Sequence, residues 1–217
     1  MTFVDLEFVS RVYALWGRIP LVYDASNLVT YLGKERFLRK RVVSLLGVTR
    51  GASVLDLACG NGSNFPYLQR RVGPNGTLTG FDYSIEMLQA ARARVAGAGW
   101  TNVRLRQGDA ARLPFPDECF DGVVSTLGVS AIPEHEAALE HCRRVLKPGA
   151  AIVILDAKPF DGLLRVFNPL VKLAYAVGAS WDYKKDVVGC LRSLFGDVFV
   201  ERYNGGSMYV ARAVKRG

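Results

Sequence analysis

Five short segments expected to be strands alternate with helical segments between Ser53 and Leu155, and this alternation limits the fold more than any other feature of the chain. The first of these segments is almost continuously apolar, as in a strand buried on both faces of a parallel sheet. Alternation at such short intervals is typical of a doubly wound α/β fold. The expected strands are Ser53–Ala58, Thr77–Phe81, Val103–Gln107, Asp121–Ser125 and Ala150–Leu155, and the expected helices are residues 34–46, Asn64–Val72, Ile85–Ala96 and Glu134–Leu146.

The C-terminal part of the chain breaks this alternation. Two further expected strands, Val198–Tyr203 and Ser207–Ala213, are separated by only three residues. So short a connection forces antiparallel pairing, because a parallel crossover needs about a dozen residues. We find no internal repeat and no low-complexity linker, so we expect one domain over residues 1–217.

Composition excludes several classes of protein. No apolar run reaches the roughly 18–20 residues that span a bilayer, and the N-terminus does not resemble a secretory signal. The four cysteines are widely spaced and the chain has two histidines, so we expect reduced thiols, a cytoplasmic location and no metal site. The formal net charge of +8 has three possible roles: it keeps the protein soluble, it binds nucleic acid, or it binds an anionic membrane surface. No basic run with interleaved aromatics appears, which argues against nucleic acid.

Small and acidic residues stand where the first three strands end, the edge at which open α/β sheets bind ligands. Gly60 and Gly62 follow the first strand, Asp82 follows the second, and Asp109 with Ala110 follows the third. A carboxylate at the position of Asp82 can accept both hydroxyls of a ribose. The alternatives are a turn for the glycines, a helix cap for Asp82 (although Ser84 is better placed to cap), and a turn or cap for Asp109.

These segments together resemble the successive motifs of class I S-adenosylmethionine-dependent methyltransferases. The motifs are VLDLACGNG ending at Gly62, Asp82, GDAARLPF from Gly108, Phe120-Asp121 and RVLKPG ending at Gly149, and they occur in order over about residues 20–156. The resemblance implies a Rossmann-like, doubly wound sheet of seven strands, parallel except for one antiparallel strand from the C-terminal hairpin, with helices on both faces. It implies S-adenosylmethionine as cofactor and S-adenosylhomocysteine as product.

The resemblance also implies a role for each matching residue. Asp56, Gly60 and Gly62 would shape the loop beneath the methionine portion, although Asp56 could equally only buttress that loop. Asp82 would bind the ribose, Tyr83 would pack beside the adenine, and Asp109 with Ala110 would contact its edge. Ser125, Thr126 and Leu127 would lie near the reacting sulfonium. Lys147-Pro148-Gly149 is expected to be a structural turn.

Acceptor choice is expected to lie outside the shared core. We divide the chain into an N-terminal helical acceptor or membrane segment (1–50), a cofactor-binding core (51–156), an acceptor-covering insertion (157–185), and a last helix with the hairpin (186–217). Tyr23-Asp24-x-x-Asn27 resembles the entry segment of quinone-biosynthesis methyltransferases and their phosphatidylethanolamine-methylating relatives. In that group the tyrosine lies near the transferred methyl, so Tyr23 is a candidate for aligning the acceptor, or else an aromatic that packs a helix.

The quinone enzymes typically have an arginine–asparagine pair after the fourth strand, where this chain has Leu127–Ile132, reading LGVSAI. The first prediction is therefore methylation of a lipid or lipophilic acceptor, with the amino headgroup of phosphatidylethanolamine as the leading choice. Methylation of a quinone precursor or another soluble metabolite on carbon or oxygen is the alternative, and a non-catalytic nucleotide-binding protein is a remote one. Oily segments near basic residues predict peripheral contact with an anionic membrane, through residues 3–19, the basic cluster Lys34–Arg41 and Lys158–Lys185.

Overall fold

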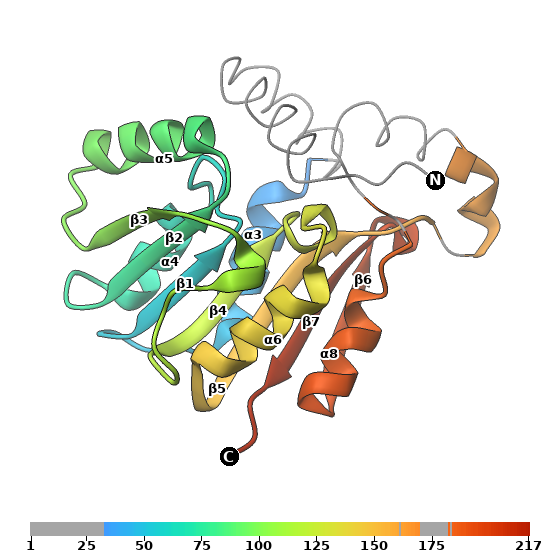
Figure 1. The fold of residues 1–217 in the computed structure, drawn as a ribbon. Coiled ribbons are helices and arrows are strands. Elements are labelled where there is room, and N and C mark those ends of the chain that lie inside the picture. The colour runs from blue at the N-terminus through green and yellow to red at the C-terminus, as the bar shows by residue number, and fades with distance from the viewer. Residues whose placement is uncertain (1–32, 161, 170–181, 183) are drawn as a thin grey trace.

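A computed structural model describes residues 33–160, 162–169, 182 and 184–217. One seven-stranded sheet forms its centre, in the order β3-β2-β1-β4-β5-β7-β6 (Figure 1). Six strands run in one direction, and β7 is antiparallel to both of its neighbours. The strands are β1 (Ser53–Leu57), β2 (Thr77–Asp82), β3 (Val103–Gln107), β4 (Phe120–Thr126), β5 (Leu146–Ala157), β6 (Val198–Tyr203) and β7 (Met208–Val214). The predicted fold class is confirmed.

Helices cover both faces of the sheet, as Figure 1 shows. The helices α3, α4 and α5 pack on one face, and α6 and α8 pack on the other. The described α-helices are α3 (Glu35–Leu46), α4 (Phe65–Val72), α5 (Ile85–Gly97), α6 (His135–Val145) and α8 (Val187–Phe195). Short 3-10 turns are η1 (Ala110–Arg112), η2 (Val129–Ala131), η3 (Gly162–Phe167) and η4 (Asn204–Gly206).

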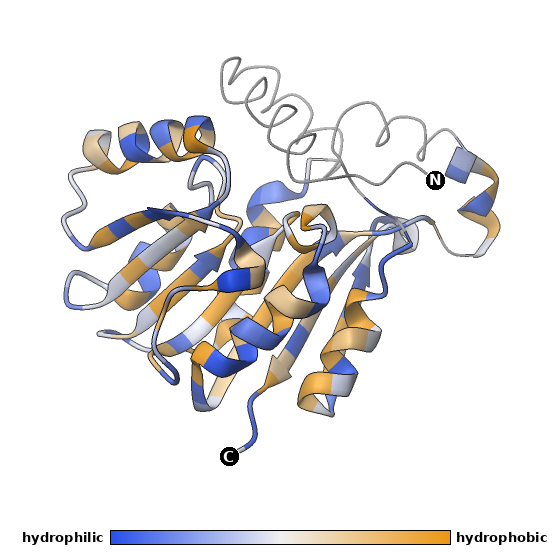
Figure 2. Ribbon diagram, in the orientation of Figure 1, coloured by the Kyte–Doolittle hydropathy of each residue, from blue (hydrophilic) through white to orange (hydrophobic). Residues whose placement is uncertain are grey.

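The strands at the centre of the sheet contain many hydrophobic residues, drawn in orange in Figure 2. In β1, the side chains of Leu55 and Leu57 belong to the core beneath α6 and α8, whereas Val54 belongs to the core beneath α3 and α4. This two-sided burial explains the nearly continuous apolar character of the segment. β1 ends where the backbone turns away from the sheet at Ala58, which has a φ of +51°.

The segment Lys147-Pro148-Gly149 differs from its prediction as a turn. It lies inside β5, where the pairing with β4 jumps from Phe120–Leu146 to Gly122–Ala151. Gly149 has a φ of +78°, and its N–H donates to the carbonyl of Lys215. The sequence predicts a chain reversal here. The backbone instead forms an irregularity within β5, because the carbonyl of Lys215 in the C-terminal segment accepts a hydrogen bond from Gly149.

No helix in the described ranges is both long enough and apolar enough to cross a bilayer. The described part of the insertion contains η3, whose side chains are mostly exposed: Leu163 is 97% exposed and Val166 is 73% exposed. The remaining parts of the predicted membrane segments, including residues 3–19, lie outside the described residues.

Candidate active site

A cavity opens at the ends of β1, β2 and β4 and beside the segment that follows β3. Its wall comes from α3, from the loop after β1, from the tips of β2 and β4, and from the segments that follow β3 and β4. The lining residues are Arg39, Ala58, Cys59, Gly60, Asn61, Ser63, Asn64, Phe81, Asp82, Tyr83, Ser84, Gly108, Asp109, Ala110, Thr126, Leu127, Gly128, Ala131, Ile132 and Pro133. Segments that are far apart in sequence therefore meet at the edge that the strand pattern predicts for a ligand.

The loop after β1 turns tightly enough to require left-handed backbone angles. Gly60 has a φ of +54° and Gly62 a φ of +75°, and Ala58 adopts +51° although it has a side chain. Within the loop, the N–H of Gly62 donates to the carbonyl of Cys59. The small residues thus allow a turn that brings backbone to the cavity wall, as close approach of a ligand demands.

Asp82 connects the tip of β2 to this loop. Its Oδ2 accepts a hydrogen bond from the N–H of Gly60 at 2.8 Å, and its Oδ1 accepts one from the N–H of Ser84 at 2.9 Å. Burial raises the pKa of the Asp82 carboxyl, and the backbone N–H groups oppose that rise. The expected cap of α5 is Ser84 itself, whose Oγ accepts from the N–H of Met87. Asp82 is therefore left to serve the loop and the cavity.

The predicted adenine residues also lie at the cavity. Tyr83 is 39% exposed and lies beside the opening, and Ala110 begins η1. Asp109 caps η1, because its Oδ1 accepts from the N–H of Ala111 at 2.9 Å, and it still lines the cavity. The cap and the binding role that the sequence left as alternatives for Asp109 are thus compatible.

A buried polar network lies beneath the glycine loop, and sequence reasoning missed two of its members. Asn64 donates through Nδ2 to Asp56 Oδ1 at 2.9 Å and lies 3.0 Å from Thr126 Oγ1. Arg39 donates to Asn64 Oδ1 at 2.7 Å and to Glu35 Oε1 at 2.8 Å. The amide of Asn64 therefore joins α3, β1 and β4 at one point.

Arg39 was expected to contribute to a basic surface. Instead it is only 4% exposed, and Arg41 is bound to Glu201 of β6 by two hydrogen bonds of 2.5 and 2.8 Å. Helical spacing contains the signal that was missed. Arg39 falls on the same stripe as Val42, Val43 and Leu46, three, four and seven residues later, which face the core.

Asp56 carries a carboxyl oxygen with no hydrogen-bond partner in the described structure. This Oδ2 is buried, and the whole residue is 1% exposed. Burial raises the pKa of Asp56 from 3.8 to about 7, while Asn64 and Arg39 lower it and Asp82 raises it further. Asp56 does not line the cavity, so its position agrees with a buttress of the loop.

The remaining predicted site residues divide into three groups. Thr126 and Leu127 line the cavity at the tip of β4. Gly62 shapes the loop without lining the cavity, and Ser125 is fully buried, with an Oγ that has no hydrogen-bond partner in the described structure. Tyr23 lies outside the described residues.

The residues that line the cavity can be compared with a nucleoside joined to a charged amino acid. A carboxylate that accepts hydrogen bonds stands at the β2 tip, the aromatic side chain of Tyr83 lines the cavity beside it, and small residues form the loop. Phe65 stands where a dinucleotide-binding loop would have its third glycine, at the start of α4. A ligand without a phosphate group does not require that glycine. These groups fit S-adenosylmethionine, whose methionine end has no phosphate.

Comparison with known proteins identifies the family. The model of the ubiE/COQ5 methyltransferase family matches residues 6–203. The chain belongs to the ubiE/COQ5 methyltransferase family. It is therefore an S-adenosylmethionine-dependent methyltransferase, as the ordered motifs predicted.

Similar proteins agree with this assignment. Demethylmenaquinone methyltransferases of several Staphylococcus aureus strains are 37% identical over 165 residues, covering 76% of this chain and 67% of the relative. A SAM-dependent methyltransferase of Aquifex aeolicus has a TM-score of 0.64 at 24% identity, covering 82% of this chain and 89% of the other. Phosphoethanolamine N-methyltransferase 2 of Haemonchus contortus has a TM-score of 0.71 at 18% identity, covering 85% and 53% respectively. At these identities the two structures show a shared fold.

Proposed function

We propose that this chain transfers a methyl group from S-adenosylmethionine to a ring carbon of a lipophilic quinone precursor. The observation that carries the proposal is the 37% identity to demethylmenaquinone methyltransferases over three quarters of the chain. This identity favours methylation of a quinone precursor, which the sequence left as the alternative. Phosphatidylethanolamine, the leading choice there, is supported only by a shared fold with a phosphoethanolamine enzyme.

The cofactor supplies a methyl group made electrophilic by its sulfonium. In this proposal Asp82 accepts the ribose hydroxyls and Tyr83 covers the adenine, which is supported by the position of both residues in the cavity lining. The glycine loop, supported from below by Asn64 and Asp56, receives the methionine portion. Methyl transfer of this kind depends mainly on alignment and on the exclusion of water.

The acceptor side of the proposed site is apolar. Leu127, Ala131, Ile132 and Pro133 line the cavity beyond the tip of β4, and among the described lining residues the carboxylates are Asp82 and Asp109. An aromatic ring packs against aliphatic side chains and displaces water from them. The segment Leu127–Ile132 lacks the arginine–asparagine pair expected of quinone enzymes, so acceptor alignment in this chain relies on shape.

A direct assay tests the proposal. The purified protein is incubated anaerobically with labelled S-adenosylmethionine and a naphthoquinol that has a short prenyl chain but no ring methyl. A parallel reaction contains phosphatidylethanolamine vesicles. We expect one methyl on the quinol ring, located by mass spectrometry and NMR. Label in the phospholipid with none in the quinol would overturn the proposal and restore the headgroup reading.

Membrane contact stays a prediction attached to this function. A lipophilic acceptor is stored in a bilayer, and η3 exposes Leu163 and Val166 with Arg165 between them. Sedimentation with vesicles of varied anionic content, at low and high salt, measures the contact directly. A protein that stays in the supernatant on anionic vesicles at low salt would contradict it.

A further inference from the structure

The segment that follows β4 forms the acceptor side of the cavity. We call Leu127–Pro133 the wall segment; it includes η2, and five of its seven residues line the cavity. Its first residue has a left-handed backbone, with a φ of +55° at Leu127, and the Leu127 N–H donates to the carbonyl of Leu155. The internal bonds of the segment are two short-range ones, Ala131 to Gly128 and Ile132 to Val129. Its position therefore depends on groups behind it.

Asp156 of β5 holds the wall segment from behind. The carboxylate is fully buried and accepts two hydrogen bonds from Ser130, from its N–H at 2.9 Å and from its Oγ at 2.7 Å. The N–H of Ala157 donates to the same carboxylate at 2.9 Å. A buried carboxylate with three donors is well satisfied, so Ser130 has one strongly preferred position.

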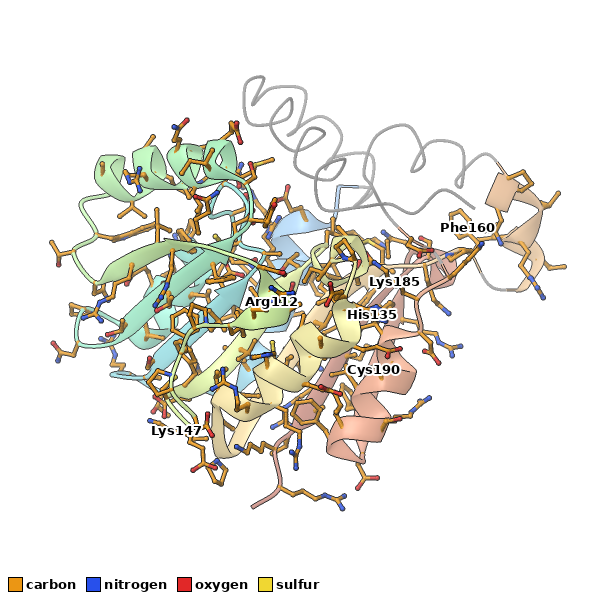
Figure 3. The ribbon with its side chains drawn as sticks, in the orientation of Figure 1. Arg112, His135, Lys147, Phe160, Lys185 and Cys190 are labelled. Carbon is orange, nitrogen blue, oxygen red and sulfur yellow. The ribbon has the colours of Figure 1, made fainter. Side chains whose placement is uncertain are left out.

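Lys185 holds the same segment from the chain that leads into α8. Its Nζ donates to the carbonyl oxygens of Ser130, at 3.0 Å, and of Ile132, at 2.5 Å. Figure 3 shows Lys185 close to the start of α6, where His135 follows the wall segment. Burial lowers the pKa of Lys185, and the charges of Asp182 and Asp156 oppose that shift. An ammonium in this position has been partly removed from water in order to bind backbone carbonyls.

The residues that hold the wall segment are not the ones that line the cavity. Asp156 and Lys185 do not line the cavity, whereas Ile132 does so while its carbonyl is bound to Lys185. Ser130 and Lys185 line a second cavity together with Tyr209 and others. Without the bonds from Asp156 and Lys185, the described hydrogen bonds that hold the wall segment to other elements would be those from the Leu127 N–H to Leu155 and from the Asp182 N–H to the Ser130 carbonyl, the latter at 3.4 Å.

We propose that Lys185 and Asp156 are positioning residues that fix the wall segment against the methyl acceptor, and that Lys185 couples this wall to the chain entering α8. The inference rests on the proposed function for the identity of the acceptor. Neither residue touches the cofactor side of the cavity, so their effect falls on the acceptor. The cofactor loop is held by different groups, Asp82 and Asn64.

Hydrogen exchange tests the positioning role without any acceptor. In Lys185→Met, amides of residues 130–132 should exchange at least tenfold faster, while residues 58–64 exchange as in the wild type. Lys184→Met is the matched control, because Lys184 is an exposed neighbour, and the side-chain donor to both carbonyls is Lys185. Unchanged exchange at residues 130–132 would overturn the proposal. Where the methionine variant does not fold, Lys185→Gln replaces it: its shorter, neutral amide can donate to one carbonyl at most, so exchange at residues 130–132 should still rise, by less than in Lys185→Met, and unchanged exchange there would again overturn the proposal.

Kinetics then test the consequence for the acceptor. With the prenylated naphthoquinol as probe, Lys185→Met should raise KM for the acceptor at least fivefold and leave the affinity for S-adenosylhomocysteine within twofold. Lys185→Arg, which can donate to both carbonyls, should recover most of the loss. Equal losses for acceptor and cofactor would overturn the positioning role. If the wild type methylates no quinol, the proposed function fails, and the exchange experiment still decides whether Lys185 holds the wall.

Discussion

The Asp82 carboxylate accepts a hydrogen bond from the backbone N–H of Gly60, with 2.8 Å between Oδ2 and the nitrogen. One side chain at the tip of β2 thus holds the loop at the end of β1 and also lines the cavity. If Asp82 binds the ribose as proposed, a substitution there removes a ligand contact and loosens the loop at the same time.

Asp82→Ala should weaken binding of S-adenosylhomocysteine by roughly 30-fold or more, which corresponds to the loss of two charge-assisted hydrogen bonds at about 2 kcal/mol in total. The fold should survive, because Asp82 lies at a strand end. Isothermal titration measures the affinity. Asp117→Ala removes an exposed acid paired with Arg144 and should leave the affinity unchanged. An unchanged affinity in the Asp82 variant would reduce Asp82 to a support for the loop.

Asn64→Leu should lower the free energy of unfolding by about 3 kcal/mol. The substitution removes the buried hydrogen bond that Asn64 donates to the Asp56 carboxyl group and the one that it accepts from the Arg39 guanidinium. Urea unfolding measures the loss. Asn64→Asp keeps an acceptor for Arg39 but faces Asp56 with a second carboxyl, so its loss should be larger at pH 8 than at pH 5. A loss below about 1 kcal/mol in the leucine variant would show that the network contributes little.

Gly62→Ala should be far more damaging than Gly99→Ala, although both glycines have a positive φ. A Cβ on Gly62 would lie 2.5 Å from the ring of Phe65, whereas one on Gly99 would meet nothing within 4 Å. Both variants pay for the left-handed backbone, on the order of 1 kcal/mol. The difference in thermal midpoint, with and without S-adenosylhomocysteine, isolates the contact with Phe65. Similar midpoints for the two variants would contradict this explanation.

This contact adds a physical reason for the small residue at position 62. The sequence predicts that Gly62 shapes the loop, and in the structure the space beside Gly62 is filled by Phe65, which is fully buried beneath the loop. A one-dimensional pattern shows that a small residue is required. It does not show whether a ligand or a neighbouring side chain requires it.

The fold could be predicted because local sequence patterns indicate where the strands lie. Apolar runs such as Ser53–Leu57 and the short hairpin connection determine strand direction and order through general rules. The tips of parallel strands meet at one edge, so Asp82 and Asp109 were located without tertiary information. The predicted boundaries of β1 and β2 each differ from the structure by one residue, which is the ordinary spread at element ends.

Groups that act through long-range contacts could not be found in the same way. Ser130 and Asp156 are 26 residues apart, and Lys185 is 55 residues from Ser130. No local pattern links such positions, because the link exists only once β4 and β5 pair. Asn64 is also ordinary in sequence, a polar residue before a helix, until folding places it between Asp56 and Thr126.

Cys59→Ser should retain most methyltransferase activity, because the thiol is not a nucleophile. Burial raises the pKa of Cys59 well above its usual value, and the charges of Asp82 and Asp56 raise it further. A thiol in this state carries almost no thiolate at neutral pH. Iodoacetamide at pH 8 should therefore modify Cys59 more slowly than the half-buried Cys119. Rapid modification of Cys59, with activity lost in the serine variant, would contradict the assignment.

Asp56→Asn should stabilise the protein more at pH 8 than at pH 5. The folded pKa of Asp56 is raised from 3.8 to about 7, so the folded state holds a proton that the unfolded state releases. For a carboxyl with a raised pKa, stability is full below the unfolded value and falls as pH rises toward the folded value. The asparagine variant does not titrate and avoids this fall.

The wild type should therefore lose on the order of 2–3 kcal/mol relative to Asp56→Asn between pH 5 and pH 8, from about two pH units at 1.36 kcal/mol each. Urea unfolding of both proteins at the two pH values gives the difference directly, and other titrating groups cancel because they are common to both. Most of the change should occur below pH 7. A difference that stays constant with pH would show that Asp56 is ionised throughout, and that Arg39 and Asn64 outweigh the effect of its burial.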